Sequence, residues 1–199
     1  MIAGYAEKTP DRLTEFAQRY QDANGVPVIY LARPGTMGSS GNQNTRRQQW
    51  ETLEINDAIT QIKARYGITK LAVAGQSGGG GLVAALIAER SDVACAVSAS
   101  GVTAIRLRDA TIPGGDPTGA ADSALWDPID QISRIHAMPG FRMFVLSDPA
   151  DTDVSFASQA AYVAKAQAAG LTAIHIPMHG KGIAHHGLAA GASGLLPSA

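Results

Sequence analysis

The segment from Leu71 to Leu82, which reads LAVAGQSGGGGL, constrains the fold of this chain more than any other. A short apolar run leads into a G-x-S-x-G pattern centred on Ser77, and an apolar stretch typical of a buried helix follows. A tight turn between a strand and a helix leaves no room for side chains two residues before and two residues after the serine. The segment therefore predicts a strand, a sharp turn that points the Ser77 hydroxyl out of the sheet, and a helix.

Short apolar runs alternate with helical patterns along most of the chain. The expected strands are Val26–Ala32, Leu71–Ala74, Val93–Ala99, Phe141–Leu146 and Thr172–Ile176. The expected helices are one that begins at Pro10 and stops at Gly25, then Arg47–Tyr66, Leu82–Ala88 and about Ser155–Ala169. This alternation predicts an α/β fold with a mostly parallel sheet and helices on both faces.

The stretch from Thr103 to Trp126 breaks this alternation. It has little periodicity and contains a Pro-Gly-Gly and an Asp-Pro sequence, both of which favour turns. It lies between two expected strands, on the side of the sheet where a site would form. We therefore expect a short cap at about residues 103–126, inserted into a single domain that covers residues 1–199.

The composition excludes several classes of protein. The 199 residues include 16 basic and 17 acidic side chains, so the net charge of -1 gives no reason to expect nucleic acid or an anionic membrane as partner. The single cysteine, Cys95, can form neither an internal disulfide nor a structural zinc site, and no metal site is expected. No apolar run approaches the roughly 18 residues of a membrane span. The first residues do not resemble a signal peptide, so a cytoplasmic location is expected, with a processed secreted form left open. The oligomeric state is not predicted.

Ser77 is the candidate nucleophile. At the start of a helix, the N–H of the next residue, Gly78, would point toward an oxyanion formed on the substrate. The alternative is a glycine-rich helix start that binds phosphate or only packs. A phosphate-binding P-loop would need Gly-Lys-Ser/Thr, and a dinucleotide loop would need G-x-G-x-x-G with a later acid, and neither pattern fits.

A serine nucleophile needs a base and an acid that orients the base, in the chain order Ser, Asp or Glu, His for this arrangement. The candidate acids after the fourth expected strand are Asp148, Asp151 and Asp153, and the candidate bases after the fifth are His179, His185 and His186. The carboxyl ends of parallel strands meet at one edge of a sheet, so these two loops can converge on the serine. The residue types alone leave the choice among them open.

Each candidate also has a structural interpretation. Asp153 suits a helix N-cap or first-turn charge, and Asp148 suits a turn before Pro149. His185 is the main rival of its neighbour His186, because adjacent residues cannot both point into the site. His175 falls within the last expected strand, where it would pack or face solvent.

Two motifs carry a resemblance to a known family. The loop that begins at Asp151 reads D-T-D-V and matches the D-x-x-V of a G-x-x-D-x-x-V-P acid loop, with Ser147 in place of the glycine and Ser155 in place of the proline. The sequence from His186 to Leu188 matches a glycine-flanked H-G-F or H-G-L histidine element. From about Pro10 to Leu188 the chain thus resembles the α/β-hydrolase superfamily, nearest to dienelactone hydrolases and prolyl-oligopeptidase-like esterases.

Two further segments agree with this resemblance. Residues 31–40, LARPGTMGSS, resemble the R-G-x-G-x-S loop that follows an early strand of the family, with one extra residue. Residues 126–129, WDPI, resemble the D/S-P segment that follows the cap. Within the first segment, Arg33 is expected to hold the loop by an ion pair, and a direct contact with substrate is the alternative.

The resemblance implies a serine hydrolase that cleaves small carboxylic esters through an acyl-enzyme, without a metal or organic cofactor. The implied site residues are Ser77, Asp151 and His186 for catalysis, and Gly78, Tyr5 and Gln76 for the oxyanion and the substrate. The expected partner is a small ester substrate. The alternatives are a peptidase or amidase with the same triad, or a non-catalytic relative that binds a small molecule under the cap.

The chain departs from the family at its start. Family members usually have two or three strands before the first helix seen here, and the loop after the last of them supplies the second oxyanion N–H. Only Met1–Tyr5 occupy this region, so we expect a fold reduced at the N-terminus. Either these residues form a stub strand that brings the backbone around Gly4 and Tyr5 near Ser77, or the chain is a truncation.

Overall fold

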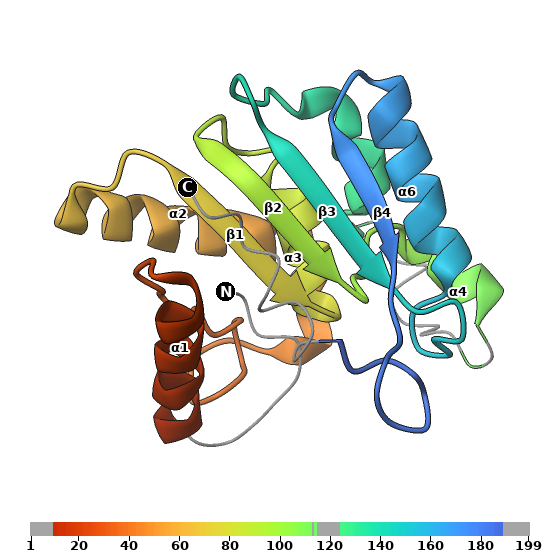
Figure 1. Cartoon of the computed structure of the whole chain (residues 1–199), viewed down its shortest axis with the longest axis horizontal. Coiled ribbons are helices and arrows are strands. Elements are labelled where there is room, and N and C mark those ends of the chain that lie inside the picture. Colours follow the sequence, from red (N-terminus) through yellow and green to blue (C-terminus); the bar gives the residue numbers. More distant parts are fainter. Residues whose placement is uncertain (1–9, 113, 115–123, 189–199) are drawn as a thin grey trace.

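Four parallel strands in the order β1-β2-β3-β4 form the sheet of this protein (Figure 1). The structure, a computed structural model, describes residues 10–112, 114 and 124–188. The strands are β1 Leu71–Gln76, β2 Val93–Ala99, β3 Arg142–Ser147 and β4 Ala173–Pro177. The helices are α1 Pro10–Asn24, α2 Gln49–Tyr66, α3 Gly78–Leu86, α4 Ile105–Thr111 and α6 Phe156–Ala168, with short 3-10 helices η1 Gln43–Thr45 and η2 Pro128–Arg134. The predicted α/β fold with a parallel sheet is therefore confirmed.

All strands run in the same direction, so their carboxyl ends lie at one edge of the sheet. At that edge Gln76 of β1 pairs with Ala99 of β2, and Ser147 of β3 pairs with Pro177 of β4. The loops that follow β1, β3 and β4 consequently all leave the sheet at this edge (Figure 1). These are the loops that carry Ser77, the three aspartates and the three histidines.

Local sequence signals determine where the helices end. The predicted C-cap of α2, Gly67, has the left-handed φ of 65° that glycine adopts without steric cost, and its N–H donates to the Lys63 carbonyl. The Ser155 side chain caps the start of α6 by accepting a hydrogen bond from the Ser158 N–H. These helices agree with the predicted ones to within about two residues.

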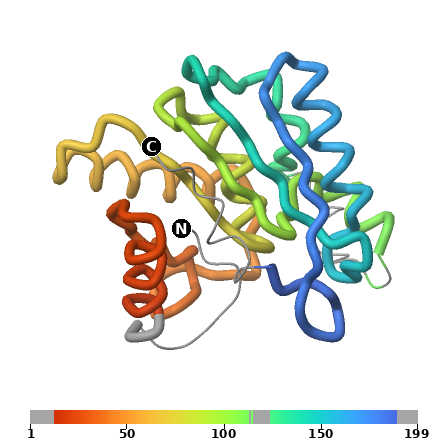
Figure 2. The backbone as a smooth tube through the Cα atoms, viewed as in Figure 1, coloured from red at the N-terminus to blue at the C-terminus, as the bar shows by residue number. Residues whose placement is uncertain are grey.

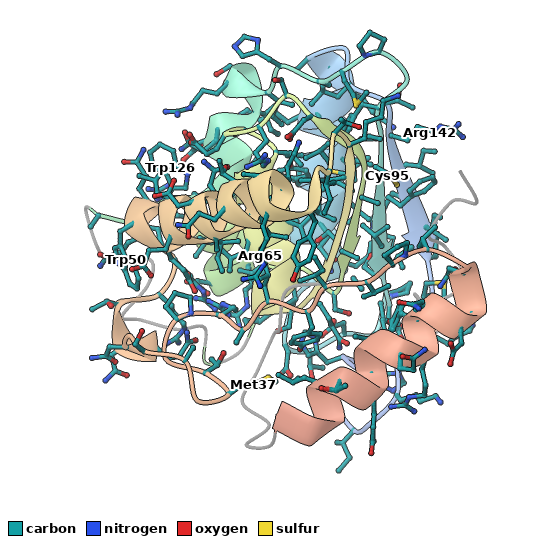
Figure 3. The ribbon with its side chains drawn as sticks, turned by 90° about the vertical axis from the view of Figure 1, so that its left-hand side faces the viewer. Met37, Trp50, Arg65, Cys95, Trp126 and Arg142 are labelled. Atoms are coloured by element: carbon teal, nitrogen blue, oxygen red, sulfur yellow. The ribbon has the colours of Figure 1, made fainter. Side chains whose placement is uncertain are left out.

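The two faces of the sheet are packed differently. One face meets α2, α3 and α6 in a cluster that includes Ile55, Ile59, Leu82, Val83, Leu86, Met143, Val145, Tyr162 and Val163. The other face carries a smaller cluster of Cys95, Val97, Ala99, Leu146 and Leu188. Seen from the side, α1 and α2 lie on opposite sides of the sheet (Figure 3). Cys95 is buried and behaves as a small apolar residue.

The predicted strand Val26–Ala32 is wrong. Only Leu31 makes a β-bridge, and the flanking residues are irregular. A strand is stable only where its N–H and C=O groups find a neighbouring strand, and within the described residues β1 has β2 as its only strand partner. The apolar pattern was still informative, because the Leu31 side chain packs against the larger core cluster.

The described part of the predicted cap contains α4. The Asp127 carboxylate accepts hydrogen bonds from the N–H groups of Ile105 and Arg106, at 2.8 and 3.0 Å, and so satisfies the first donors of this helix. The backbone N–H of the neighbouring Trp126 donates to the Arg47 carbonyl, and this tryptophan lies beside the start of α2 (Figure 3). Residues 113 and 115–123 lie outside the described residues, so the cap limits and the single domain stay predictions.

Candidate active site

Ser77 occupies a sharp turn between β1 and α3. Its φ of 55° and ψ of -122° are unusual for a residue with a side chain, and such a conformation persists only where the surroundings hold it. The Ser77 N–H donates to the Ala99 carbonyl at 2.9 Å, and the Ser77 carbonyl accepts from the Val102 N–H at 3.2 Å. Hydrogen bonds to the loop after β2 thus hold the elbow that the G-x-S-x-G pattern predicts.

The glycines around Ser77 allow close backbone packing. A Cβ atom at Gly75 would lie 2.4 Å from the Gly79 carbonyl group, which is closer than real Cβ contacts occur. A Cβ atom at Gly78 would lie 2.0 Å from Nη1 of Arg33. The first glycine is needed for the turn itself, and the second is needed because a guanidinium packs against the start of α3.

Gly78, the predicted oxyanion donor, is the first residue of α3. The first N–H groups of a helix have no carbonyl acceptor within the helix, and the helix dipole adds partial positive charge there. Ser77 itself is only partly buried. Tyr5, the predicted second contributor, lies outside the described residues.

The Arg33 side chain forms the expected ion pair. Its Nε and Nη2 donate to Oε1 of Glu51 at 2.9 and 2.6 Å, and both residues are almost fully buried. The second carboxylate oxygen, Oε2, accepts from the Arg47 N–H at 2.8 Å. This pair fastens the loop after Leu31 to the first turn of α2.

A pocket lies between this ion pair and the elbow. Its polar side is formed by Arg33, Arg47 and Glu51, and Gly78 lies at its boundary. Its apolar side is formed by Leu82, Ala85, Val102, Ile105, Trp126 and Pro128. This pocket therefore adjoins the residue that follows Ser77.

Asp151 and His186 lie together at the same edge of the sheet. Nδ1 of His186 is 2.9 Å from Oδ2 of Asp151, whose side chain is fully buried. The other oxygen, Oδ1, accepts from the N–H groups of Asp153 and Val154, both at 2.9 Å. This contact uses Nδ1 of His186 and leaves Nε2 as the ring nitrogen that does not face Asp151.

Gln76 connects the histidine to the elbow. Its Nε2 donates to the His186 carbonyl at 3.0 Å, across 110 residues of sequence. Gln76 directly precedes Ser77, so this hydrogen bond fixes the backbone of His186 beside the nucleophile turn. Gln76 was predicted to contact the oxyanion or substrate. In the structure its side-chain amide donates to the His186 carbonyl.

The rival residues are in other environments. His185 pairs with Asp148, with Nδ1 3.2 Å from Oδ2. Among the described residues, the Asp153 side chain makes no hydrogen bond, and His179 is exposed on the surface. The structure therefore brings Asp151 to His186 and a different carboxylate to His185.

A second serine–histidine contact also exists. Ser147 Oγ lies 2.5 Å from His175 Nε2. Ser147 is fully buried at the end of β3, whereas a nucleophile must be reachable by its substrate. His175 lies within β4, stacked 4.4 Å from the Phe156 ring, and its burial lowers its pKa. This contact satisfies the buried Ser147 hydroxyl, and of the two alternatives expected for the partly buried His175, packing or facing solvent, its ring packs against Phe156.

Sequence reasoning missed the full role of Asp148. Its Oδ1 accepts from the Ala150 N–H at 2.8 Å, which is the local turn that an Asp-Pro sequence predicts. Its Oδ2 accepts from the Gly180 N–H at 2.6 Å, which no local signal could have shown. The described residues contain no His, Cys, Asp and Glu group that could hold a metal ion, and none of their helices is long and apolar enough to cross a membrane.

Known proteins resemble the chain in structure but not in sequence. No family model and no curated protein matches it. The esterase PE8 matches with a TM-score of 0.67 at 14% identity, over 98% of this chain and 88% of that one. An esterase from Pyrococcus furiosus matches with a TM-score of 0.69 at 14% identity, over 89% of this chain and 72% of that one.

A larger protein contains the same fold. The acylaminoacyl peptidase of Pyrococcus horikoshii matches with a TM-score of 0.66 at 13% identity, over 83% of this chain. This chain covers only 29% of that peptidase. The parallel strand order, the elbow between β1 and α3 and these structural matches together show that the chain has the α/β-hydrolase fold.

Proposed function

We propose that this protein is a serine hydrolase that cleaves small carboxylic esters through an acyl-enzyme on Ser77. One observation carries the proposal: Nδ1 of His186 lies 2.9 Å from the fully buried carboxylate of Asp151, and the backbone of that histidine is hydrogen-bonded to the residue before Ser77. An accessible serine in a nucleophile turn and a base oriented by a buried acid are the requirements for acyl transfer by this route.

The first half-reaction acylates the serine. His186 Nε2 takes the proton of the Ser77 hydroxyl while Oγ bonds to the ester carbonyl carbon, and the π electrons move onto the carbonyl oxygen. The Gly78 N–H donates to this oxyanion. When the intermediate collapses, the C–O bond of the alcohol breaks, and the departing oxygen takes the proton from His186. Asp151 stabilises the imidazolium throughout.

The second half-reaction repeats these steps with water. His186 Nε2 takes a proton from a water molecule as its oxygen attacks the acyl carbon. The tetrahedral intermediate then releases the Ser77 oxygen, which recovers its proton from His186. The acid product leaves and the free enzyme is restored.

The pocket beside Gly78 favours small acyl groups. Its lining includes Trp126 and the buried ion pair of Arg33 with Glu51. We expect kcat/KM to be higher for p-nitrophenyl acetate and butyrate than for the palmitate ester or a peptide amide. Each extra methylene that finds room would add at most about 1–3 kcal/mol. If palmitate or the amide were clearly fastest, a lipase or a peptidase would replace the esterase proposal.

Labelling with a fluorophosphonate probe tests the nucleophile. The intact protein should be labelled once, and Ser77→Ala should lose the label and up to about a million-fold in turnover. Ser147→Ala is the matched control, because it removes a serine hydroxyl that hydrogen-bonds to a histidine, and it should keep the label and its turnover. Persistent labelling of Ser77→Ala would disprove the assignment. A folded protein with neither label nor turnover would favour a small-molecule binding protein.

A further inference from the structure

A second aspartate–histidine pair joins the two loops that carry Asp151 and His186. Asp148 is buried, and its Oδ2 accepts from the Gly180 N–H at 2.6 Å and lies 3.2 Å from Nδ1 of His185. The side chains of Asp151 and Asp148 therefore both connect the loop after β3 to the loop after β4. Figure 2 shows these loops together below the carboxyl ends of the strands.

The loop after β4 is otherwise held mainly through its backbone. The Lys181 N–H donates to the Gly187 carbonyl at 3.0 Å, and the Gly187 N–H donates back at 3.1 Å, which closes the loop on itself. The Thr152 N–H donates to the Ala184 carbonyl at 3.0 Å. Asp148 adds a carboxylate that reaches both sides of this closed loop, through Gly180 and His185.

The backbone of His185 separates the two imidazoles. Its φ of 55° is left-handed, a conformation in which His, Asn and Asp are the most frequent residues after glycine. This local turn directs His185 toward Asp148 and His186 toward Asp151. The loop is also tightly packed here, because a Cβ atom at Gly180 would lie 1.8 Å from the His185 carbonyl oxygen.

We propose that Asp148 and His185 form a positioning pair that holds the His186 imidazole in line between Asp151 and Ser77. The inference rests on the proposed function and adds two residues to it. Neither side chain lines the pocket beside Gly78, so the pair acts on the placement of the base and not on substrate binding. A displacement of a catalytic group by about 1 Å can cost about a hundredfold in rate.

The charge state of Asp148 supports this role. Hydrogen bonds from the N–H groups of Ala150 and Gly180 lower the pKa of its carboxyl group, so the carboxylate is ionised at neutral pH. An ionised oxygen can accept from Gly180 and from His185 together. A neutral amide at this position has one acceptor oxygen where the carboxylate has two, so it would lose the hydrogen bond from the Ala150 N–H or the one from the Gly180 N–H, and its NH2 group would then face a donor.

Asp148→Asn tests the proposal against a matched control. We expect kcat for p-nitrophenyl acetate to fall about 10- to 100-fold with KM within about twofold, because the base is misplaced while the pocket is intact. Asp153→Asn removes the same charge from the same loop at an exposed side chain, and its kcat should match that of the unmodified protein. Exchange of the Gly180 amide proton, followed by NMR, should accelerate in Asp148→Asn only.

A pair of His185 variants separates the contact from the backbone conformation. Asn and Asp both tolerate the left-handed φ, and their Nδ2 or Oδ atom occupies the place of the imidazole Nδ1. His185→Asn keeps a donor toward Asp148 and should retain kcat within about threefold. His185→Asp sets a second carboxylate against Asp148 and should lose at least about tenfold in kcat at unchanged KM.

The outcomes distinguish this inference from the proposed function. Unmodified kcat and unmodified Gly180 exchange in Asp148→Asn would overturn the positioning role while leaving a Ser77 esterase intact. Equal kcat in the two His185 variants would also overturn the positioning role and leave a Ser77 esterase intact, even if Asp148→Asn failed to fold. If the unmodified protein showed no turnover and no label on Ser77, the proposed function would fail, and the positioning role would fail with it.

Discussion

Two aspartates at opposite ends of the sheet show how differently one residue type can be used. Asp92 lies at the amino end, just before β2, where Lys63 and Arg90 both donate to its carboxylate. Asp151 lies in the loop beyond the carboxyl end of β3, where two backbone N–H groups hold one of its oxygens and His186 takes the other. The first carboxylate is partly exposed and the second is fully buried.

The two carboxylates differ in whether cationic side chains already balance their negative charge. Two cationic side chains, Lys63 and Arg90, pair with the carboxylate of Asp92, and the hydrogen bond from Arg90 is the main reason that the pKa of Asp92 falls to about 2. Neutral N–H groups stabilise Asp151 without cancelling its charge, so the charge remains available to an imidazolium on His186. The carboxylate at the amino end suits a structural contact, and the one at the carboxyl end suits the orientation of a base.

The largest expected effect comes from replacing an aspartate by asparagine at each end of the sheet and comparing the two variants. Asp151→Asn should lower kcat by about ten-thousandfold, because an amide can hold the wrong tautomer of His186. Asp92→Asn should leave kcat unchanged, because it lies at the far end of the sheet. Steady-state kinetics with p-nitrophenyl acetate would measure both. Equal activity of the two variants would show that Asp151 does not orient the base.

A second comparison uses a glycine from each end. Gly75→Ala should lower the free energy of unfolding by about 3 kcal/mol, since its Cβ would meet the Gly79 carbonyl at 2.4 Å. Gly140, in the turn before β3, has a φ of 81° but open space around it, so Gly140→Ala should cost only about 1 kcal/mol. Urea unfolding of both variants would measure this. A smaller loss for Gly75→Ala than for Gly140→Ala would contradict the close packing of the elbow.

The smallest expected effect concerns pH and stability. The pKa of Asp92 is lowered on folding, so its ion pairs stabilise the protein above the ordinary aspartate pKa of about 4, and this stabilisation is lost as pH falls toward about 2. Asp92→Asn should therefore lower Tm by a few degrees at pH 7, with the difference shrinking below pH 4. A difference in Tm that grew on acidification would show that the ion pairs are not its source.

Local patterns in the sequence predicted most of the fold. The strand Val93–Ala99 was predicted to the residue, and the end of α2 followed from Gly67, because periodicity and caps act over a few neighbouring residues. The strand predicted at Val26–Ala32 failed because pairing depends on a neighbour that a local pattern does not contain. Helix α4 was missed for a similar reason, since its N-cap residue, Ala104, supplies no side-chain acceptor and the carboxylate that accepts from its first N–H groups belongs to Asp127, far along the chain.

The sequence by itself determined the elbow around Ser77, because a strand, a tight turn and a helix are consecutive and the steric need for Gly75 arises within five residues. Only the tertiary structure decided how the acids and histidines pair. Asp151 reaches His186 across 35 residues and Asp148 reaches His185 across 37, and both choices depend on how two loops pack against each other. A buried carboxylate takes whichever donors the folded backbone brings within about 3 Å, and those donors are distant in sequence.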